Sequence, residues 1–139
     1  MHKTLQNKLK KPLKFEVYWH RIGYVLVGAV VVLSLISPPD IPLWDTPWTD
    51  KLFHFLAYGF LMLWFAQLYT RTVFWIIATV FFSMGIGLEV AQTLTDDRFF
   101  GVMDMVANGV GVASGWAAAC ARFDSLLDIV EKRLLKSSL

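Results

Sequence analysis

Three short polar motifs interrupt the long apolar runs of this sequence and carry the side chains that could do chemistry. The first contains an aspartate, a lysine and a histidine, the second a glutamate and a glutamine, and the third an aspartate and an asparagine. Together with a tyrosine and one arginine, these residues are Asp50, Lys51, His54, Tyr58, Glu89, Gln92, Arg98, Asp104 and Asn108. Such a set can bind an anion, hydrogen-bond a sugar or an amide, or transfer a proton.

Uncharged runs must position these motifs, and each run has the length of a membrane span. The runs cover residues 22–39, 52–70, 72–88 and 105–121. A helix needs about 20 apolar residues to cross the hydrocarbon core of a bilayer. Because the chain is also 56% hydrophobic, it is too apolar for an ordinary soluble domain of 139 residues. We predict an all-α membrane protein, a small bundle of four transmembrane helices.

The predicted organisation has a basic segment (residues 1–21), the four-helix domain (residues 22–121) and an amphipathic tail (residues 122–139). No A-x-A-like cleavage site follows the first run, which favours a retained anchor over a signal peptide. The single Cys120 rules out a disulfide framework. The tail is predicted to lie along the inner leaflet or to act as a solubilising end. Its apolar stripe contains Phe123, Leu126, Leu127, Val130 and Leu134.

The basic residues predict how the chain is oriented. Only Lys51 and Arg98 of the 13 Lys and Arg residues fall in the two links that follow the first and third runs. The other eleven fall on the opposite side, which the positive-inside rule makes cytoplasmic. We therefore expect a multi-pass membrane protein with both termini in the cytoplasm and the two acidic links outside. The basic residues are accounted for by topology, so they do not indicate nucleic-acid binding.

With this topology, the three polar motifs meet near the outer ends of three helices. Taken singly, each residue has a structural explanation, such as an interfacial histidine, a first-turn acid, a snorkelling lysine or an interhelical hydrogen bond. Glu89 fits such explanations least, because an ionisable group inside a span costs about 2.5–3.5 kcal/mol even on lenient insertion scales. The convergence of all of them favours a functional site on the outer side.

A stripe of small residues in the fourth run predicts a close helix crossing. Ala107, Gly111 and Gly115 repeat every four residues on the face that continues from Asp104. Small side chains let a second helix approach backbone to backbone. Because Gly85 lies one turn before Glu89, a close crossing of the third and fourth spans would bring Glu89 near the asparagine of the third motif.

The same motifs resemble those of the VanZ-like membrane proteins, a family named for a protein linked to teicoplanin resistance. The resemblance rests on "DKLFHFLAYGFL", "GLEVAQ", a following arginine and "MDMVANGVGVASG", and it covers roughly residues 48–116. The family pattern falls on Asp50, Lys51, His54, Tyr58, Glu89, Gln92, Arg98, Asp104, Ala107, Asn108, Gly111 and Gly115. It implies a bacterial inner-membrane protein connected with the cell envelope, and it implies no established reaction.

The first functional hypothesis is a binding site for an anionic or glycosylated headgroup, or for a lipoglycopeptide, in the outer leaflet. Arg98 and Lys51 would attract phosphate or carboxylate. Gln92, Asn108 and Tyr58 would hydrogen-bond sugar or amide groups. The partners would then be membrane lipids or lipid-linked envelope precursors, and binding could confer glycopeptide resistance.

Two other hypotheses remain open. An enzyme could hydrolyse or transfer a lipid-linked phosphate headgroup, with His54 and either Glu89 or Asp104 as base and orienting carboxylate, and Arg98 stabilising the developing anion. A metal ion held by His54, Glu89 and Asp104 would be a variant of this enzyme. These residues lack a recognised metal-ligand spacing, so we predict no cofactor. A transporter would need a homo-oligomer, since the polar residues stop near the outer end.

Overall fold

The computed structural model describes residues 10–36, 47–94 and 101–137. Within these ranges the chain is helical and contains no strand. The long helices are α2 (Glu16–Leu35), α3 (Pro47–Leu68), α4 (Phe74–Gln92) and α5 (Val102–Cys120). A 3-10 turn, η1 (Arg71–Val73), joins α3 to α4, and a second, η2 (Phe123–Ser125), leads into α6 (Leu126–Ser137).

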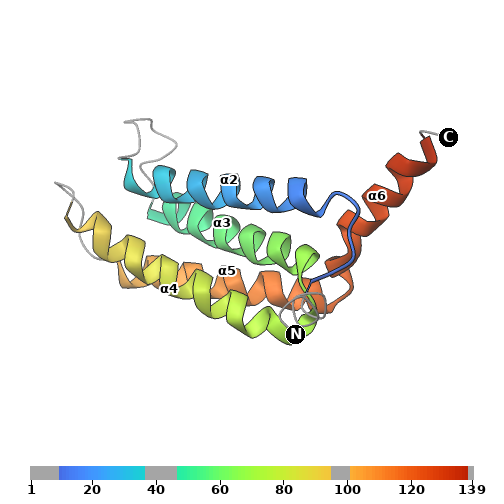
Figure 1. Cartoon of the computed structure of the whole chain (residues 1–139). Helices are drawn as coiled ribbons and strands as arrows, with labels where there is room; N and C mark the ends of the chain where they lie inside the picture. Colours follow the sequence, from blue (N-terminus) through green and yellow to red (C-terminus); the bar gives the residue numbers. More distant parts are fainter. Residues whose placement is uncertain (1–9, 37–46, 95–100, 138–139) are drawn as a thin grey trace, which may run out of the picture.

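The four long helices lie side by side, and each runs antiparallel to the next along the chain (Figure 1). The start of α2 therefore lies at the same end of the molecule as the end of α3, the start of α4 and the end of α5. Helix α6 leaves this end at an angle (Figure 1). The other end carries the start of α3, the end of α4 and the start of α5, which are the segments that hold the polar motifs.

The helices extend beyond the uncharged runs. Helix α2 begins at Glu16, six residues before the predicted start, because a charged side chain at a helix end can reach water without breaking the helix. Helix α3 begins at Pro47, five residues before the uncharged run that starts at residue 52. Proline at the first helical position costs little, since its missing N–H has no intrahelical partner there.

Three of the described helical segments are long and apolar enough to cross a membrane: Glu16–Leu35, Trp48–Leu68 and Arg71–Gln92. Helix α5 is not among them, in contrast to the expectation of four spans. Its polar Asp104 and Asn108 and its glycines lower its hydropathy, although its 19 residues are nearly enough to span. The structure thus shows an all-helical protein with three apolar candidates for membrane spans.

Helix α3 lies at the centre of the packing and contacts α2, α4, α5 and α6. Most of its buried apolar side chains belong to one face, and the ring of Phe65 packs edge-on against Phe81 of α4 at 5.2 Å between centroids. The buried apolar residues of α3 are Tyr58, Leu61, Met62, Phe65, Ala66 and Leu68.

Glycines bring α3 and α5 into backbone contact. A Cβ atom at Gly111 would lie 3.1 Å from the Gly59 nitrogen and would clash with the Phe55 carbonyl oxygen. A Cβ at Gly115 would clash with the Gly59 carbonyl oxygen and lie 3.0 Å from the Met62 Cβ. Gly111 and Gly115 of the stripe therefore face α3, and a side chain at either position would push the two helices apart.

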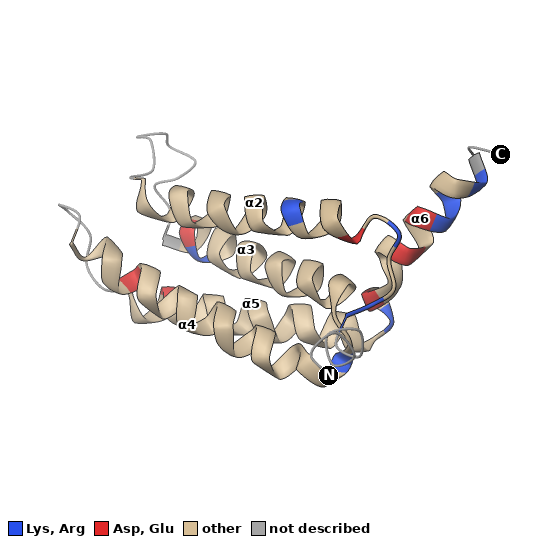
Figure 2. Ribbon diagram, in the orientation of Figure 1, with Lys and Arg blue, Asp and Glu red and all other residues tan. Residues whose placement is uncertain are grey.

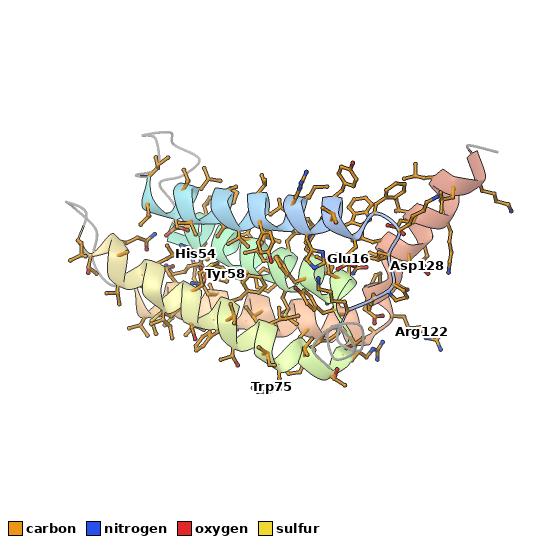
Figure 3. The ribbon with its side chains drawn as sticks, in the orientation of Figure 1. Glu16, His54, Tyr58, Trp75, Arg122 and Asp128 are labelled. Carbon is orange, nitrogen blue, oxygen red and sulfur yellow. The ribbon has the colours of Figure 1, made fainter. Side chains whose placement is uncertain are left out.

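The outward faces of the long helices are apolar. Val25 and Leu33 of α2 are 71% and 70% exposed, and Trp75 of α4, at the periphery in Figure 3, is 59% exposed. Soluble proteins rarely expose continuous apolar faces of this kind, whereas lipid-facing helices do so throughout. The surface thus agrees with the apolar character of the helices.

At the end from which α6 leaves, polar contacts attach α6 to the rest of the molecule. The Glu131 carboxylate accepts hydrogen bonds from the backbone N–H groups of Lys14 (2.7 Å) and Phe15 (2.8 Å) and from the Trp19 indole (2.7 Å). The Gln67 side-chain oxygen accepts the Leu126 N–H at 2.8 Å. These contacts cap the start of α2 and the start of α6 with side chains from other helices.

Asp124 completes this attachment by pairing with two cations. Its Oδ2 lies 3.1 Å from the Lys11 Nζ, and its Oδ1 lies 3.3 Å from the Arg71 guanidinium. Burial alone would raise the pKa of the Asp124 carboxyl, but hydrogen bonds from Arg71 and Lys11 outweigh it and hold that pKa below its usual value. Burial alone would also raise the pKa of the Glu131 carboxyl. Hydrogen bonds, chiefly from the Phe15 N–H and the Trp19 indole, outweigh burial and lower that pKa.

Candidate functional site

The polar motifs meet at the end of the molecule opposite to α6. Figure 2 shows the acidic residues at the start of α3, near the end of α4 and near the start of α5 together at this end. His54 and Tyr58 lie on α3 toward the same end (Figure 3). The antiparallel course of the helices is what brings these three segments, distant in sequence, to one level.

Four side chains form an accessible rim, namely Asp50, Lys51, His54 and Asp104. Their side chains are 50%, 28%, 12% and 14% exposed, respectively. The Lys51 Nζ pairs with Asp104 Oδ1 at 3.0 Å, which links α3 to α5. The Asp50 Oδ1 lies 3.8 Å from the His54 Nε2, one helical turn away on α3. The rim thus combines two carboxylates, an ammonium group and an imidazole, all reachable from outside.

The hydrogen bond between His54 and Asn108 fixes how the imidazole is presented. The His54 Nδ1 lies 3.0 Å from the Asn108 Oδ1. An amide oxygen only accepts, so the Nδ1 donates and must carry a proton. In the neutral imidazole, the Nε2 then holds a lone pair and faces Asp50.

Four further side chains form a buried floor beneath the rim, namely Tyr58, Glu89, Gln92 and Asn108. They are 1%, 3%, 5% and 1% exposed. The amide nitrogen of Asn108 and the ring of Tyr58 both pack against Gly85 of α4, where a Cβ would approach them to 2.9 and 3.3 Å. The Gln92 Nε2 donates to the Ser34 carbonyl of α2 at 2.6 Å. The floor therefore ties α2, α3, α4 and α5 together beneath the rim.

Glu89 contacts the residue at which α5 begins. Its Oε1 accepts the Gly101 N–H at 2.5 Å, which satisfies a backbone donor that precedes the helix. A Cβ at Gly101 would lie 2.9 Å from this oxygen and would clash with the Asp104 Oδ2. A side chain at Gly101 would have to displace these two carboxylate groups, so the Glu89 and Asp104 carboxylates are neighbours at this residue.

The structure places the predicted site residues as follows. It brings Asp50, Lys51, His54 and Asp104 together, and sets Tyr58, Glu89, Gln92 and Asn108 below them. Ala107 is partly buried on α5, between these residues and the glycine crossing. Arg98 lies outside the described residues. His54 is oriented by Asn108 and lies beside Asp50, whereas the sequence predicted Glu89 or Asp104 as its carboxylate partner.

Some residues that shape the site went unnoticed in the sequence. Gly59 provides the α3 side of the glycine crossing, and Gly101 gives the two carboxylates room. Gly101 lies three residues before Asp104 of the third motif, so a glycine at a helix start close to a carboxylate was a usable signal. Gly59 carries no such signal, because its partner on α5 is identified only by the packing of the two helices.

A family model matches most of the chain. The family is described as VanZ/LLP1, and the match covers residues 3–123. It extends well beyond residues 48–116, on which the motif resemblance rested, and includes the first apolar helix. No curated protein and no solved structure matches the chain.

The fold and the comparison together define the class of protein. The apolar helices and their exposed apolar faces are those of a helical membrane protein. The chain belongs to the VanZ/LLP1 family.

Proposed function

We propose that this chain binds an anionic or glycosylated headgroup at the outer face of a bacterial inner membrane. The ligand would be a lipid, a lipid-linked envelope precursor or a lipoglycopeptide, and binding would change how such molecules are presented to glycopeptide antibiotics. The observation that best supports this is a rim of four polar side chains that stay partly exposed above a buried polar floor. Groups that serve packing alone would have little reason to remain accessible at the mouth of an apolar bundle.

The proposed topology has four membrane-crossing helices, α2 to α5, with both termini in the cytoplasm. Helix α5 crosses with the others because its glycines pack it directly against α3. The basic groups at the α6 end, including Lys10, Lys11 and Arg71, then face the cytoplasm, in agreement with the positive-inside rule. The rim, which carries Lys51 as its basic group, faces outward.

The chemistry of the rim suits a headgroup that has both charge and hydrogen-bonding groups. Lys51 is the cation that a phosphate or carboxylate would meet first, and it is already positioned by Asp104. Arg98, in the same link as Asp96 and Asp97, would add a bidentate donor. The Asp50 carboxylate, the most exposed group of the rim, would accept hydrogen bonds from sugar hydroxyls or amides.

The buried floor would then act as a support for the rim. Asn108, Gln92 and Tyr58 are too deeply buried to be first contacts for a headgroup. Asn108 holds the imidazole of His54, and Glu89 holds the start of the helix that carries Asp104. In this proposal the ligand-binding roles expected of the floor residues become positioning roles.

The function is tested in a bacterium that depends on this chain for its resistance to teicoplanin. Lys51→Met and His54→Ala should each return susceptibility to that of a strain without the chain, while the variants accumulate in the membrane at near-normal levels. Glu89→Gln should keep the resistance, because glutamine can still accept the Gly101 N–H and removes the cost of a buried charge. Resistance unchanged by Lys51→Met and His54→Ala would count against a site in this cluster.

A second candidate function is turnover of a lipid-linked phosphate headgroup. It is favoured by the contact between His54 and Asn108, which orients the ring through Nδ1 and, in the neutral imidazole, leaves the Nε2 lone pair free to act as a base. In that case, purified protein should release phosphate or a phosphorylated headgroup from a lipid-linked substrate, and His54→Ala should abolish the release. Binding without turnover would support the first function alone.

A further inference from the structure

The accessible rim contains three potential metal ligands that come from two helices. Asp50 and His54 lie one turn apart on α3, and Asp104 lies in the first turn of α5. One ligand atom from each, two carboxylate oxygens and an imidazole nitrogen, lies within 4.8 Å of the other two. This trio contains Asp50 in place of Glu89, because the buried Glu89 is bonded to the Gly101 N–H.

The imidazole of His54 has the orientation and the tautomer that a metal ligand needs. Its Nδ1–H donates to Asn108, so in the neutral ring the Nε2 lone pair is available beside Asp50. Histidines that bind metals usually donate their second N–H to a fixed acceptor, which orients the ring. Asn108 is such an acceptor, since it is 1% exposed and packed against Gly85.

The charges of the rim leave room for a cation. Two carboxylates face one ammonium group, so the rim carries one net negative charge when His54 is neutral. Lys51 pairs with Asp104, and among the residues that the structure describes Asp50 has an ion-pair contact with His54 alone. A metal ion would replace Lys51 at Asp104 and would neutralise both carboxylates.

We propose that Asp50, His54 and Asp104 bind a divalent transition metal ion of the Zn²⁺ or Mn²⁺ type. One imidazole with two carboxylates suits these ions better than Ca²⁺ or Mg²⁺, which prefer oxygen ligands throughout. The ligand atoms must close to about 2.0–2.2 Å from a Zn²⁺ ion. The half-exposed Asp50 can rotate to do so, and Lys51 can swing away into solvent. Water would complete the coordination.

The proposal stands without the headgroup function but would deepen it. A divalent ion on the rim would present positive charge to the same phosphate that Lys51 is proposed to attract. The headgroup site and the metal site predict opposite effects of removing Lys51 on the binding affinity. Removing its ammonium group weakens an anion site, but it strengthens a metal site by removing a competitor for Asp104.

Isothermal titration of the untagged, detergent-solubilised protein with Zn²⁺ at pH 7.5 tests the proposal. One Zn²⁺ should bind per chain with a dissociation constant in the micromolar range. Asp50→Asn and His54→Gln should each weaken binding at least tenfold, whereas Asp128→Asn on α6 should not change it. Asp50→Asn is the safest of these variants because its side chain is half exposed. Lys51→Met should tighten binding several-fold.

Two results would overturn the metal proposal. One is that neither the wild-type protein nor Lys51→Met binds Zn²⁺. The other is that Asp50→Asn and His54→Gln, shown to be folded by circular dichroism, bind Zn²⁺ as tightly as the wild type. If Lys51→Met instead gains affinity for Zn²⁺ but restores no teicoplanin susceptibility, the metal site holds and the headgroup function fails.

Discussion

The imidazole of His54 and the side-chain amide of Asn108 join α3 to α5 through a 3.0 Å contact between Nδ1 and Oδ1. This contact lies above the glycine crossing that holds the two helices together. It sets which ring nitrogen of His54 carries the proton, and it leaves Nε2 directed at Asp50. The packing of two helices thereby determines the chemistry that the histidine can offer.

The first prediction concerns this tautomer. Neutral His54 should carry its proton on Nδ1, and Asn108→Ala should move it to Nε2, because the Asp50 carboxylate then becomes the nearest acceptor. Nitrogen-15 NMR of histidine-labelled protein distinguishes the two forms. His20 is the matched control, since its Nδ1 donates to the Glu16 carbonyl oxygen at 2.8 Å and should not respond. A wild-type His54 protonated on Nε2 would contradict the assignment.

The second prediction tests the glycine crossing of α3 and α5. Gly111→Leu and Gly115→Leu should each destabilise the protein by about 3 kcal/mol or more, because the added side chains meet backbone atoms that cannot move aside. Thermal unfolding in detergent and the yield of folded protein measure this effect.

Val110→Leu provides the control for the glycine variants. Val110 lies beside Gly111 on α5 but is 51% exposed, so a larger side chain there should be tolerated. Val112 is unsuitable, because it is only 5% exposed and belongs to the core. Wild-type stability in both glycine variants would disprove the close crossing.

The third prediction concerns topology. Cys120→Ser first removes the exposed native thiol, and single cysteines are then placed at Thr46, Asp97 or Lys136. The first two should react with an impermeant thiol reagent in intact cells, and the third only after permeabilisation, because the basic residues gather on the α6 side. The reverse pattern would place the rim in the cytoplasm.

The fourth prediction is a pH dependence at the α6 end. The folded pKa values of Asp124 and Glu131 are lowered, so their ionised forms stabilise the docking of α6 at any pH above their usual pKa values. That stabilisation is lost as the pH falls below the usual pKa values of aspartate and glutamate and through the lowered folded values. Hydrogen exchange of α6, corrected for the intrinsic pH effect, should show protection at pH 5–7 and its loss below that range.

Glu131→Gln separates this effect from general acid unfolding. Glutamine offers one acceptor oxygen where the carboxylate accepts three N–H groups, so α6 should exchange faster already at pH 7 and respond less to acid. The long helices should keep wild-type protection in the same experiment. Equal protection of α6 in the variant and the wild type would show that Glu131 does not hold this helix.

The sequence predicted the parts of the fold that depend on local pattern. Uncharged runs located the long helices. The polar motifs were placed correctly at helix ends, since a charged residue that borders an apolar run must lie where the helix leaves the membrane. Three of the described helices are long and apolar enough to cross a membrane. Helix α5 was expected as a fourth, but its glycines and Asn108 serve packing and lower its hydropathy.

The sequence could not supply the features that depend on how helices meet. Glu131 lies outside the apolar stripe predicted for the tail, yet it is 5% exposed because the chain before α2 packs against it. Helical spacing places Asp50 beside His54 on α3, but whether His54 would also meet Asn108 or Asp104 depended on the tilt and rotation of α3 against α5, which the glycine crossing fixes. Helical spacing alone says which residues share a face, and not which neighbour that face meets.

The central claim, that the accessible rim binds an anionic headgroup, is tested most directly by photo-crosslinking in nanodiscs. The probe is a phosphatidylglycerol with a photoreactive group on its headgroup, and mass spectrometry locates the modified residues. The account predicts crosslinks within residues 48–54 and 101–104 that are lost in Lys51→Met and kept in Lys51→Arg, with both variants folded. Crosslinks confined to α6 and the segment before α2, unchanged by Lys51→Met, would contradict it.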